Sequence, residues 1–342
     1  MGNEKRKNLS GLNYLRAISA LLVVFYHYTT RYLDIVYNMG AEKSRIGLWW
    51  GCWAVSVFFI LSGFLTLYSM SEKTDVKSYF KKRIIRLYPA YWTAIIITTV
   101  VTYLFMPTMI TDIKSTLFNF TMLQGFVGVT AVDGVYWTLR YELEFYVIIG
   151  VLIFLFKHIK LKNGYEKFCA VWILSVLGLS IANRLNITNV VTKVLNILIM
   201  PQYAHTFIIG ISLYYITKNK NNYLSYFNLA VSLIIHVINF TVQYAVLVVF
   251  VCILIFFIAK KEISFKYDKV LVWISNISFP LYLVHQKVGY TIIYYCEKFS
   301  LGIWIGIVLA FCVSLILAHL IHVFVEKPAL NFYKKRNFKG NL

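Results

Sequence analysis

Long apolar stretches alternate with short polar segments along nearly the whole chain. Ten of the apolar stretches approach the ~20 residues that a helix needs to cross a bilayer. Their predicted bounds are 12–32, 47–70, 88–106, 135–156, 167–183, 194–217, 224–241, 243–259, 271–295 and 302–325. The pattern predicts an all-α integral membrane protein with about ten transmembrane helices, organised as one membrane domain over residues 1–342.

Composition and charge agree with this class. Hydrophobic residues make up 59% of the chain and charged residues 14%, and the mean hydropathy is +0.68. The net charge of +20 is also compatible with a nucleic-acid partner. The positions of the basic residues, however, indicate that the charge reflects membrane topology. If the N-terminus is cytoplasmic, 24 of the 34 Lys and Arg residues fall on the cytoplasmic side. This positive-inside bias predicts two cytoplasmic termini, a multi-pass location in the inner (plasma) membrane and no nucleic-acid partner.

The first apolar stretch contains Arg16 and His27, eleven positions apart. At about 100° per residue, eleven steps come to three full turns plus about 20°, so both side chains lie on one face of the helix. Along the helix axis they are roughly 16 Å apart. An ionisable residue inside a membrane span costs roughly 2.5–3.5 kcal/mol or more. Two aligned ones therefore indicate a function.

Glu142 and Glu144 are the two acidic residues well inside a predicted span. Counted from the helix ends, Glu142 and His27 can lie at the same depth, and a carboxylate beside an imidazole orients it as a general base. The alternative is that Glu142 only neutralises Arg16 or Arg140. Arg140 and Glu144 are spaced i,i+4 and are expected to form a structural salt bridge.

The segment KSYFKKRIIRLYPAYW is rich in basic residues. Arg83 and Arg86 are spaced i,i+3, so on a helix they offer forked donors suited to phosphate oxygens, as in coenzyme A. Pro89 is expected to mark the helix entry. In the preceding span, Ser62 and Gly63 interrupt a bulky face, which indicates either close helix contact or room for a pantetheine arm.

The ninth stretch reads SNISFPLYLVHQK and carries a polar stripe. Tyr282 and His285 are spaced i,i+3, so this stripe is expected to face the same cavity as His27. The alternative for His285 is a structural hydrogen bond. Five scattered cysteines without CxxC spacing predict neither disulfides nor a metal site. His319, His322 and Glu326 in the last helix favour local pairs over a metal.

Six motifs taken in order resemble the acyltransferase-3 family of multi-spanning membrane acyltransferases. They are LRAISALLVVFYH, FFILSGFL, RIIRLYPAYW, WTLRYELEFY, SFPLYLVH and FVEKP. The family's arginine–histidine pair matches Arg16 and His27, and its RxxR pair matches Arg83 and Arg86. Its tryptophan-to-glutamate motif matches Trp137 and Glu142. Leu143 stands where a second acidic residue is frequent, and no SGNH hydrolase-like domain is expected after Glu326.

The resemblance implies an O-acyltransferase that moves an acyl group, commonly acetyl, from cytoplasmic acyl-CoA to a hydroxyl of a cell-surface or lipid-linked glycan. His27, Glu142 and Arg16 are then the expected catalytic residues. The expected contacts of the donor are Arg83, Arg86, Ser62 and Gly63, and those of the acceptor are Trp137, Tyr282 and His285. The expected donor substrate is acetyl-CoA or another acyl-CoA, and no metal is expected.

A proton-coupled transporter or a flippase of lipid-linked saccharide is the alternative, with the buried Arg, His and Glu residues as a relay. It leaves the RxxR pair unexplained. The acceptor, any protein partners and the oligomeric state are not readable from the sequence. Direct transfer and an acyl-enzyme intermediate also both remain open.

Overall fold

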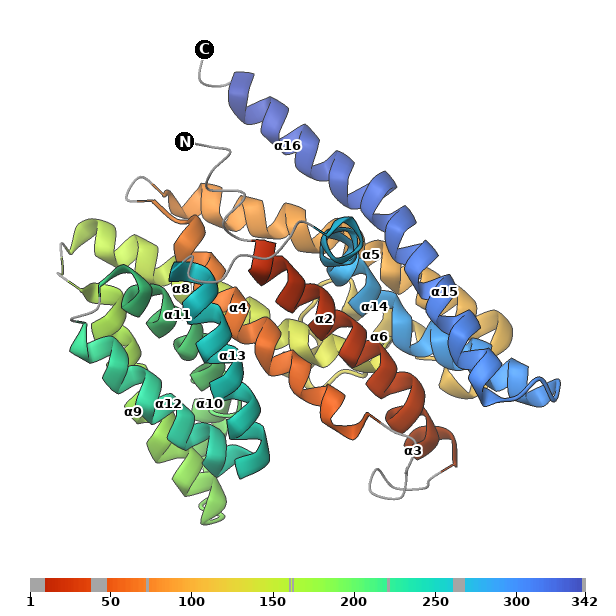
Figure 1. Ribbon diagram of the computed structural model, residues 1–342, viewed down its shortest axis with the longest axis horizontal. Helices are drawn as coiled ribbons and strands as arrows, with labels where there is room; N and C mark the ends of the chain where they lie inside the picture. The colour runs from red at the N-terminus through yellow and green to blue at the C-terminus, as the bar shows by residue number, and fades with distance from the viewer. Residues whose placement is uncertain are drawn as a thin grey trace. The chain divides into compact units, whose positions relative to one another are not determined.

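Every regular element that the computed structural model describes is a helix; the described residues are 10–37, 48–71, 74–159, 161, 163–219, 222–260 and 268–339. Figure 1 shows the helices in order along the chain. The longer elements are α2 (Ser10–Tyr26), α4 (Ala54–Ser69), α5 (Val76–Phe105), α8 (Trp137–His158), α9 (Gly164–Arg184), α10 (Val190–Leu198), α11 (Ala204–Lys218), α12 (Tyr223–Asn239), α13 (Val242–Lys260), α14 (Lys269–Lys298), α15 (Ile303–Ile321) and α16 (Lys327–Lys339). Shorter elements are η1 (His27–Arg31), α3 (Tyr32–Tyr37), η2 (Trp49–Trp53), η3 (Pro107–Met109), α6 (Ile113–Asn119), α7 (Gln124–Val127), η4 (Gly134–Tyr136) and η5 (His322–Glu326).

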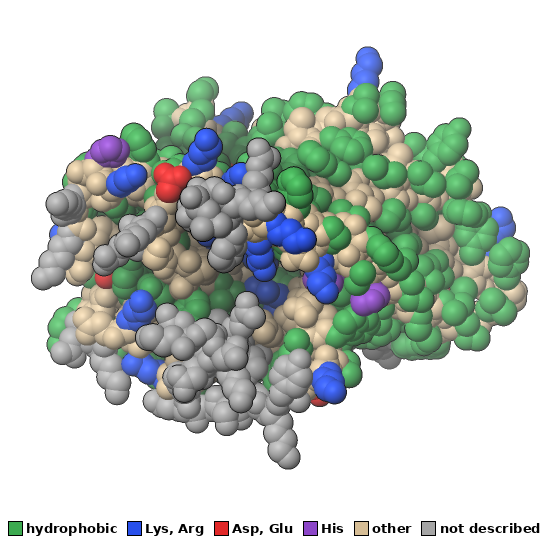
Figure 2. Space-filling model, turned by 90° about the horizontal axis from the view of Figure 1, so that it is seen from above, with side chains coloured by type: hydrophobic (Ala, Val, Ile, Leu, Met, Phe, Trp, Pro, Cys, Tyr) green, Lys and Arg blue, Asp and Glu red, His purple; other side chains and the backbone are tan. Residues whose placement is uncertain are grey.

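Five helical segments among the described residues are long and apolar enough to cross a membrane. They are Trp50–Ser69, Val76–Phe105, Gly164–Arg184, Val242–Lys260 and Ile303–Lys335. Large apolar side chains such as Ile96, Tyr103 and Val246 are exposed, and green hydrophobic side chains cover much of the face in Figure 2. Such a surface suits lipid contact. The predicted all-helical, multi-pass membrane class is therefore confirmed, whereas the number ten and the sides of the termini stay predictions.

The chain divides into two compact units. Unit 1 comprises Met1–Arg16, Trp53–Tyr79 and Tyr141–Lys269, and unit 2 comprises Ala17–Cys52, Phe80–Arg140 and Val270–Leu342.

In unit 1, α11 packs against α4, α9, α12 and α13. Two glycines allow the closest of these contacts. A Cβ atom on Gly210 of α11 would lie 2.0 Å from the Ile60 carbonyl oxygen, and one on Gly63 of α4 would lie 2.2 Å from the Phe207 carbonyl oxygen. The two backbones thus approach each other through small residues, as helices in membranes commonly do. Around them lies an apolar core that includes Phe64.

The predicted span 194–217 is not one continuous helix. It consists of α10 and α11, separated by a turn in which Met200 has a φ of 53°. Proline at position 201 lacks the N–H that would continue the helix. Two side chains satisfy carbonyls that the break frees: Trp172 donates to the Ile199 carbonyl at 2.9 Å, and Asn239 donates to the Pro201 carbonyl at 2.7 Å. Such compensation is required where water is scarce.

The helix expected to begin at Pro89 begins at Val76 instead, so that expectation is wrong. Asp75 precedes the helix and its carboxylate accepts a hydrogen bond from the Ser78 N–H at 3.2 Å, which is an N-terminal cap. Pro89 lies inside α5. A membrane helix tolerates an internal proline where neighbouring groups satisfy the backbone.

In unit 2, Asn119 organises the segment between α5 and α8. Its amide nitrogen donates to the carbonyls of Ser115 and Thr130 at 2.7 and 2.8 Å, and its oxygen accepts from the Val132 N–H at 3.0 Å. Asn119 is fully buried. One side chain thereby links both ends of a segment in which the sequence alone carries no readable signal.

We predict that Gly210→Ala destabilises the protein by about 1–3 kcal/mol, because the added methyl group overlaps the Ile60 carbonyl of α4. Gly178→Ala in α9 is the matched control, since its Cβ would meet nothing within 4 Å. Alanine is also the better helix former there. Thermal unfolding of both variants in detergent micelles measures the difference. Equal melting temperatures would contradict the close contact.

Candidate active site

His27 and His285 lie in direct contact within unit 2. The His285 Nε2 atom is 3.1 Å from the His27 Nδ1 atom, and the two rings meet edge to face with centroids 4.9 Å apart. His285 is fully buried in α14, whereas His27 is half-buried at the start of η1. The structure thus brings together two residues that are 258 positions apart in the sequence.

The hydrogen bonds of the two rings assign their protons. The His285 Nδ1 atom lies 2.9 Å from the Tyr282 carbonyl oxygen and 3.1 Å from that of Leu281. Carbonyl oxygens only accept hydrogen bonds, so this nitrogen carries the proton and His285 Nε2 is an acceptor. The His27 Nδ1 atom is 2.8 Å from the Val23 carbonyl oxygen and faces His285 Nε2, so it too carries a proton. In a neutral His27 ring, the unprotonated nitrogen is therefore Nε2.

Tyr28 fixes the position of His285. Its hydroxyl donates to the His285 carbonyl oxygen at 2.9 Å and lies 2.8 Å from the Ser314 Oγ atom of α15. Room for the Tyr28 ring comes from Gly289, where a Cβ atom would lie 2.2 Å from a ring carbon. One buried tyrosine thereby joins η1, α14 and α15 around the histidine pair.

His27 begins a segment of π-helix, His27–Arg31, in which the Tyr32 N–H donates to the His27 carbonyl five residues earlier. Such widened turns are rare and occur frequently at functional sites. Here the turn buries the three consecutive residues Tyr28, Thr29 and Thr30. The backbone itself is thus specialised at the position of the candidate base.

Tyr282 lies one turn before His285 and joins α14 to the start of α8. Its hydroxyl donates to the Val135 carbonyl at 2.9 Å and accepts from the Thr138 hydroxyl at 2.9 Å. Trp137 is the first residue of α8 and is 41% exposed. The accessible ring suits contact with a substrate; the binding roles of both residues stay predictions.

Asp133 is a fully buried carboxylate in the segment before α8. One of its oxygens accepts from the Val135 N–H at 3.2 Å and the other from the Lys287 N–H at 3.0 Å. Burial raises the pKa of Asp133 to about 6, against the opposing effects of these hydrogen bonds and of the Lys287 charge. Asp133 thus connects the start of η4 to Lys287 of α14, which lies two positions past His285.

Arg16 and Glu142 belong to unit 1, whereas His27 belongs to unit 2. Arg16 is half-buried in α2. The Glu142 carboxylate accepts a short hydrogen bond from the Tyr146 hydroxyl one turn along α8. The pairing of Glu142 with His27 stays a prediction, and so do the catalytic roles of Glu142 and Arg16.

Arg83 and Arg86 lie one turn apart on α5, as their spacing predicts, and both are half-buried. The neighbouring Lys81 lies over the ring of Tyr333 from α16, 5.3 Å from its centroid. Ser62 and Gly63 lie in α4 of unit 1, where Gly63 serves the close contact with α11. Donor binding by these four residues stays a prediction.

The polar residues of the last apolar segment are paired, one pair within the segment and one with α14. His322 Nδ1 lies 2.7 Å from a Glu326 carboxylate oxygen, and the indole N–H of Trp273 donates to His319 Nδ1 at 3.1 Å. Among the residues that the structure describes, no group of three or more His, Cys, Asp and Glu side chains is arranged to hold a metal ion.

The sequence interpretation missed three residues that build this site. Tyr28, Ser314 and Asp133 act through hydrogen bonds to partners remote in the chain. Asp133 carried a usable signal, since it is an acidic residue directly before an apolar stretch and followed by glycine. Tyr28 and Ser314 carried none, because tyrosine and serine are ordinary residues in apolar helices.

The comparison with protein families decides the class of this chain. A family model described as an acyltransferase domain matches residues 9–323, which run through both units. The chain belongs to the acyltransferase-3 family. The resemblance of the six motifs to this family is thereby confirmed.

Three relatives of this acyltransferase are similar over parts of the chain. Nodulation protein 10 of Rhizobium leguminosarum bv. viciae is 30% identical over 118 residues, 29% of this chain and 32% of that protein. The putative acetyltransferase ORF330 of Acidianus two-tailed virus is 29% identical over 140 residues, 40% of this chain and 39% of that protein. The O-acetyltransferase OatA of Staphylococcus aureus is 26% identical over 192 residues, 51% of this chain and 29% of that protein. Each match thus covers well under half of the relative's length. No solved structure matches the chain.

We predict that the stability of this acyltransferase depends on the protonation of Asp133. Its folded-state pKa of about 6 lies above its ordinary value of 3.8. The protonated carboxyl therefore contributes stability that is fully present below the ordinary pKa and is lost as the pH rises through the folded-state value. A shift of this size corresponds to about 3 kcal/mol.

Thermal unfolding of the wild type and of Asp133→Asn measures this contribution. The measurements run from about pH 4, near the ordinary pKa, to about pH 7, above the folded-state pKa. The stability difference between wild type and variant is expected to fall as the pH rises. Parallel pH profiles of the two proteins would show that Asp133 does not titrate in this range.

Proposed function

We propose that this protein is a membrane O-acyltransferase that moves an acyl group, preferably acetyl, from cytoplasmic acyl-CoA to a hydroxyl of a cell-surface or lipid-linked glycan. Membership of the acyltransferase-3 family supports the reaction class. The names of two relatives, an O-acetyltransferase and a putative acetyltransferase, support acetyl as the group transferred. The observation that carries the proposal is the histidine pair, in which His27 keeps an unprotonated Nε2.

In the proposed reaction, His27 Nε2 takes the proton of the acceptor hydroxyl as its oxygen attacks the thioester carbonyl. The new C–O bond forms a tetrahedral intermediate, whose collapse breaks the C–S bond. The coenzyme A thiolate leaves and receives the proton from His27 Nε2. Protons and electrons balance, and no metal takes part.

The neighbours of His27 suit the charge that forms during this step. When Nε2 holds a proton, the ring is an imidazolium whose Nδ1–H faces the Val23 carbonyl oxygen and the lone pair of His285 Nε2. Both are acceptors, and hydrogen bonds to charged donors are stronger than neutral ones. His285 therefore acts as a positioning residue that orients His27 and stabilises its charged form.

The remaining candidate residues take supporting roles in this proposal. Arg83 and Arg86 bind the phosphates of coenzyme A, and the pantetheine arm passes Ser62, whereas Gly63 serves the contact with α11. Glu142 and Arg16 set the charge of the reaction cavity. Trp137 and Tyr282 contact the acceptor. The bias of Lys and Arg along the chain supports cytoplasmic termini and an inner (plasma) membrane location.

We predict that His27→Ala abolishes acetylation of the surface glycan, whereas His285→Gln retains part of it and His285→Phe loses it. Glutamine has an oxygen that can accept from the His27 Nδ1–H, and phenylalanine has no acceptor. Loss of a general base lowers the rate about 10²–10⁴-fold. Mass spectrometry of glycans from cells that carry each variant counts the acetyl groups per repeat.

The melting temperature of each purified variant is the control for folding. Full acetylation by a folded His27→Ala variant would remove His27 from the mechanism. An unchanged glycan in cells that lack the protein altogether would instead remove the glycan as acceptor, and leave the acyl-transfer reaction itself to be tested with other hydroxyl compounds.

We predict that acetyl-CoA raises the melting temperature of the purified wild type and that the double variant Arg83→Ala/Arg86→Ala loses this effect. Binding to the folded state alone stabilises it by mass action, and the two guanidinium groups are the expected phosphate ligands. Lys82→Ala is the matched control, because Lys82 is an exposed cation on the same helix. A wild type that acetyl-CoA does not stabilise would favour the transporter alternative.

A further inference from the structure

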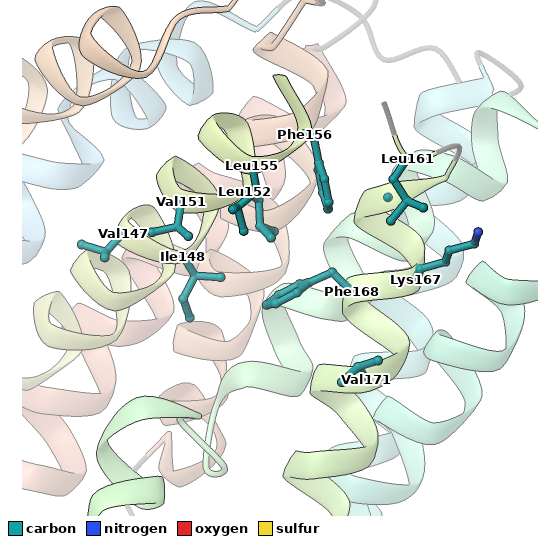
Figure 3. Close-up of a pocket in the computed structure, with 11 residues that line it drawn as sticks. Val147, Ile148, Val151, Leu152, Leu155, Phe156, Leu161, Lys167, Phe168 and Val171 are labelled. Atoms are coloured by element: carbon teal, nitrogen blue, oxygen red, sulfur yellow. The ribbon is translucent and has the colours of Figure 1, made fainter. Parts of the chain in front are cut away.

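An apolar groove lies between α8 and α9 in unit 1, and its lining contains none of the candidate site residues. It has a volume of about 510 Å³. Its lining residues are Val147, Ile148, Val151, Leu152, Leu155, Phe156, Leu161, Gly164, Lys167, Phe168 and Val171. Figure 3 shows the α8 side chains along one wall, with Phe168 directed from α9 toward them.

The groove exists because the two helices meet only near their connection. There the rings of Phe156 and Tyr165 lie 4.9 Å apart, and Gly164 approaches Phe156 so closely that a Cβ atom would lie 3.0 Å from its ring. Beyond this point α9 packs against α11 and α12. The side of α9 that carries Val171 is thus left without a packing partner on α8, and Val171 is 67% exposed.

The dimensions of the groove match one lipid chain. From Val147 to Phe156 the α8 wall spans ten residues, and their nine steps of about 1.5 Å come to about 14 Å. Half of the ~30 Å hydrocarbon core of a bilayer is about the same length. A groove of this kind suits a single acyl chain that reaches from the interface to the middle of the membrane.

Charge is confined to one end of the groove. Lys167 is the one ionisable residue in the lining that the structure describes, and it lies one turn into α9. Its side chain is exposed, as are Lys157 and His158 at the end of α8. The adjacent Glu166 is buried and its carboxylate accepts from the Asn222 amide at 2.9 Å, so this acid is engaged elsewhere. The end of the groove is therefore cationic.

We propose that this groove is a binding site for an anionic phospholipid, with one acyl chain between α8 and α9 and the phosphate beside Lys167. The stem of the lysine covers apolar surface while its ammonium group reaches the headgroup level. A basic residue at the interface attracts an anionic headgroup. The apolar wall selects a lipid over a soluble phosphate, because the chain supplies most of the buried area.

The test uses the purified full-length protein in detergent micelles with phosphatidylglycerol or phosphatidylcholine of identical acyl chains. Native mass spectrometry counts the bound lipid. We expect the wild type to prefer phosphatidylglycerol by about fivefold, the effect of about one interfacial lysine. Lys167→Ala should bind both lipids equally, and Val151→Trp, which fills the middle of the groove, should bind neither.

Lys157→Ala is the matched control, because Lys157 is exposed at the same end but does not line the groove. It should keep the preference of the wild type. The proposal is overturned if Lys167→Ala keeps the preference, if Lys157→Ala loses it equally, or if Val151→Trp binds lipid as the wild type does. Displacement of the lipid by glycerol phosphate alone would likewise show a simple phosphate site.

Discussion

The histidine pair depends on the hydrogen bonds that hold His285 Nδ1 to the backbone carbonyls of its own helix. Inside an apolar helix bundle a polar group left without a partner costs several kcal/mol, so the ring of His285 is held in one orientation and one tautomer. The His285 Nε2 atom must then accept a hydrogen bond, and the proton of His27 is therefore on Nδ1, which faces it. The state of the candidate base thus follows from backbone geometry on another helix.

Much of the fold was readable from the hydrophobic pattern, because each predicted stretch contains helix. The pattern did not reveal where helices break or extend. The turn at Met200 and the start of α5 at Val76, which Asp75 caps, depend on backbone conformation and hydrogen bonds rather than on hydrophobicity. Pro89 was misleading for the same reason, since a proline is equally compatible with a helix start and with the interior of a membrane helix.

The site was predictable where burial made a residue costly. His27 and His285 stood out as ionisable residues in apolar stretches, and their helical positions suggested a shared cavity. Their actual contact depends on the packing of η1 against α14, which involves Gly289 and Tyr28. No local signal in a sequence encodes such a long-range contact. Asp133 was overlooked because its burial arises from the fold of the segment around Asn119.

The π-helical turn at His27–Arg31 has a consequence for how this region can change. A turn closed by a five-residue hydrogen bond contains one residue more than an α-helical turn. Removal of any residue from it would restore an ordinary α-helix, and the chain before and after would remain helical. The rotational phase between α2 and Tyr32 would stay nearly the same, because the widened turn fits its extra residue within about one turn of helix. What a deletion would remove is the widened turn itself, which buries Tyr28, Thr29 and Thr30 next to His27. Residue number in this turn is thus as constrained as residue identity.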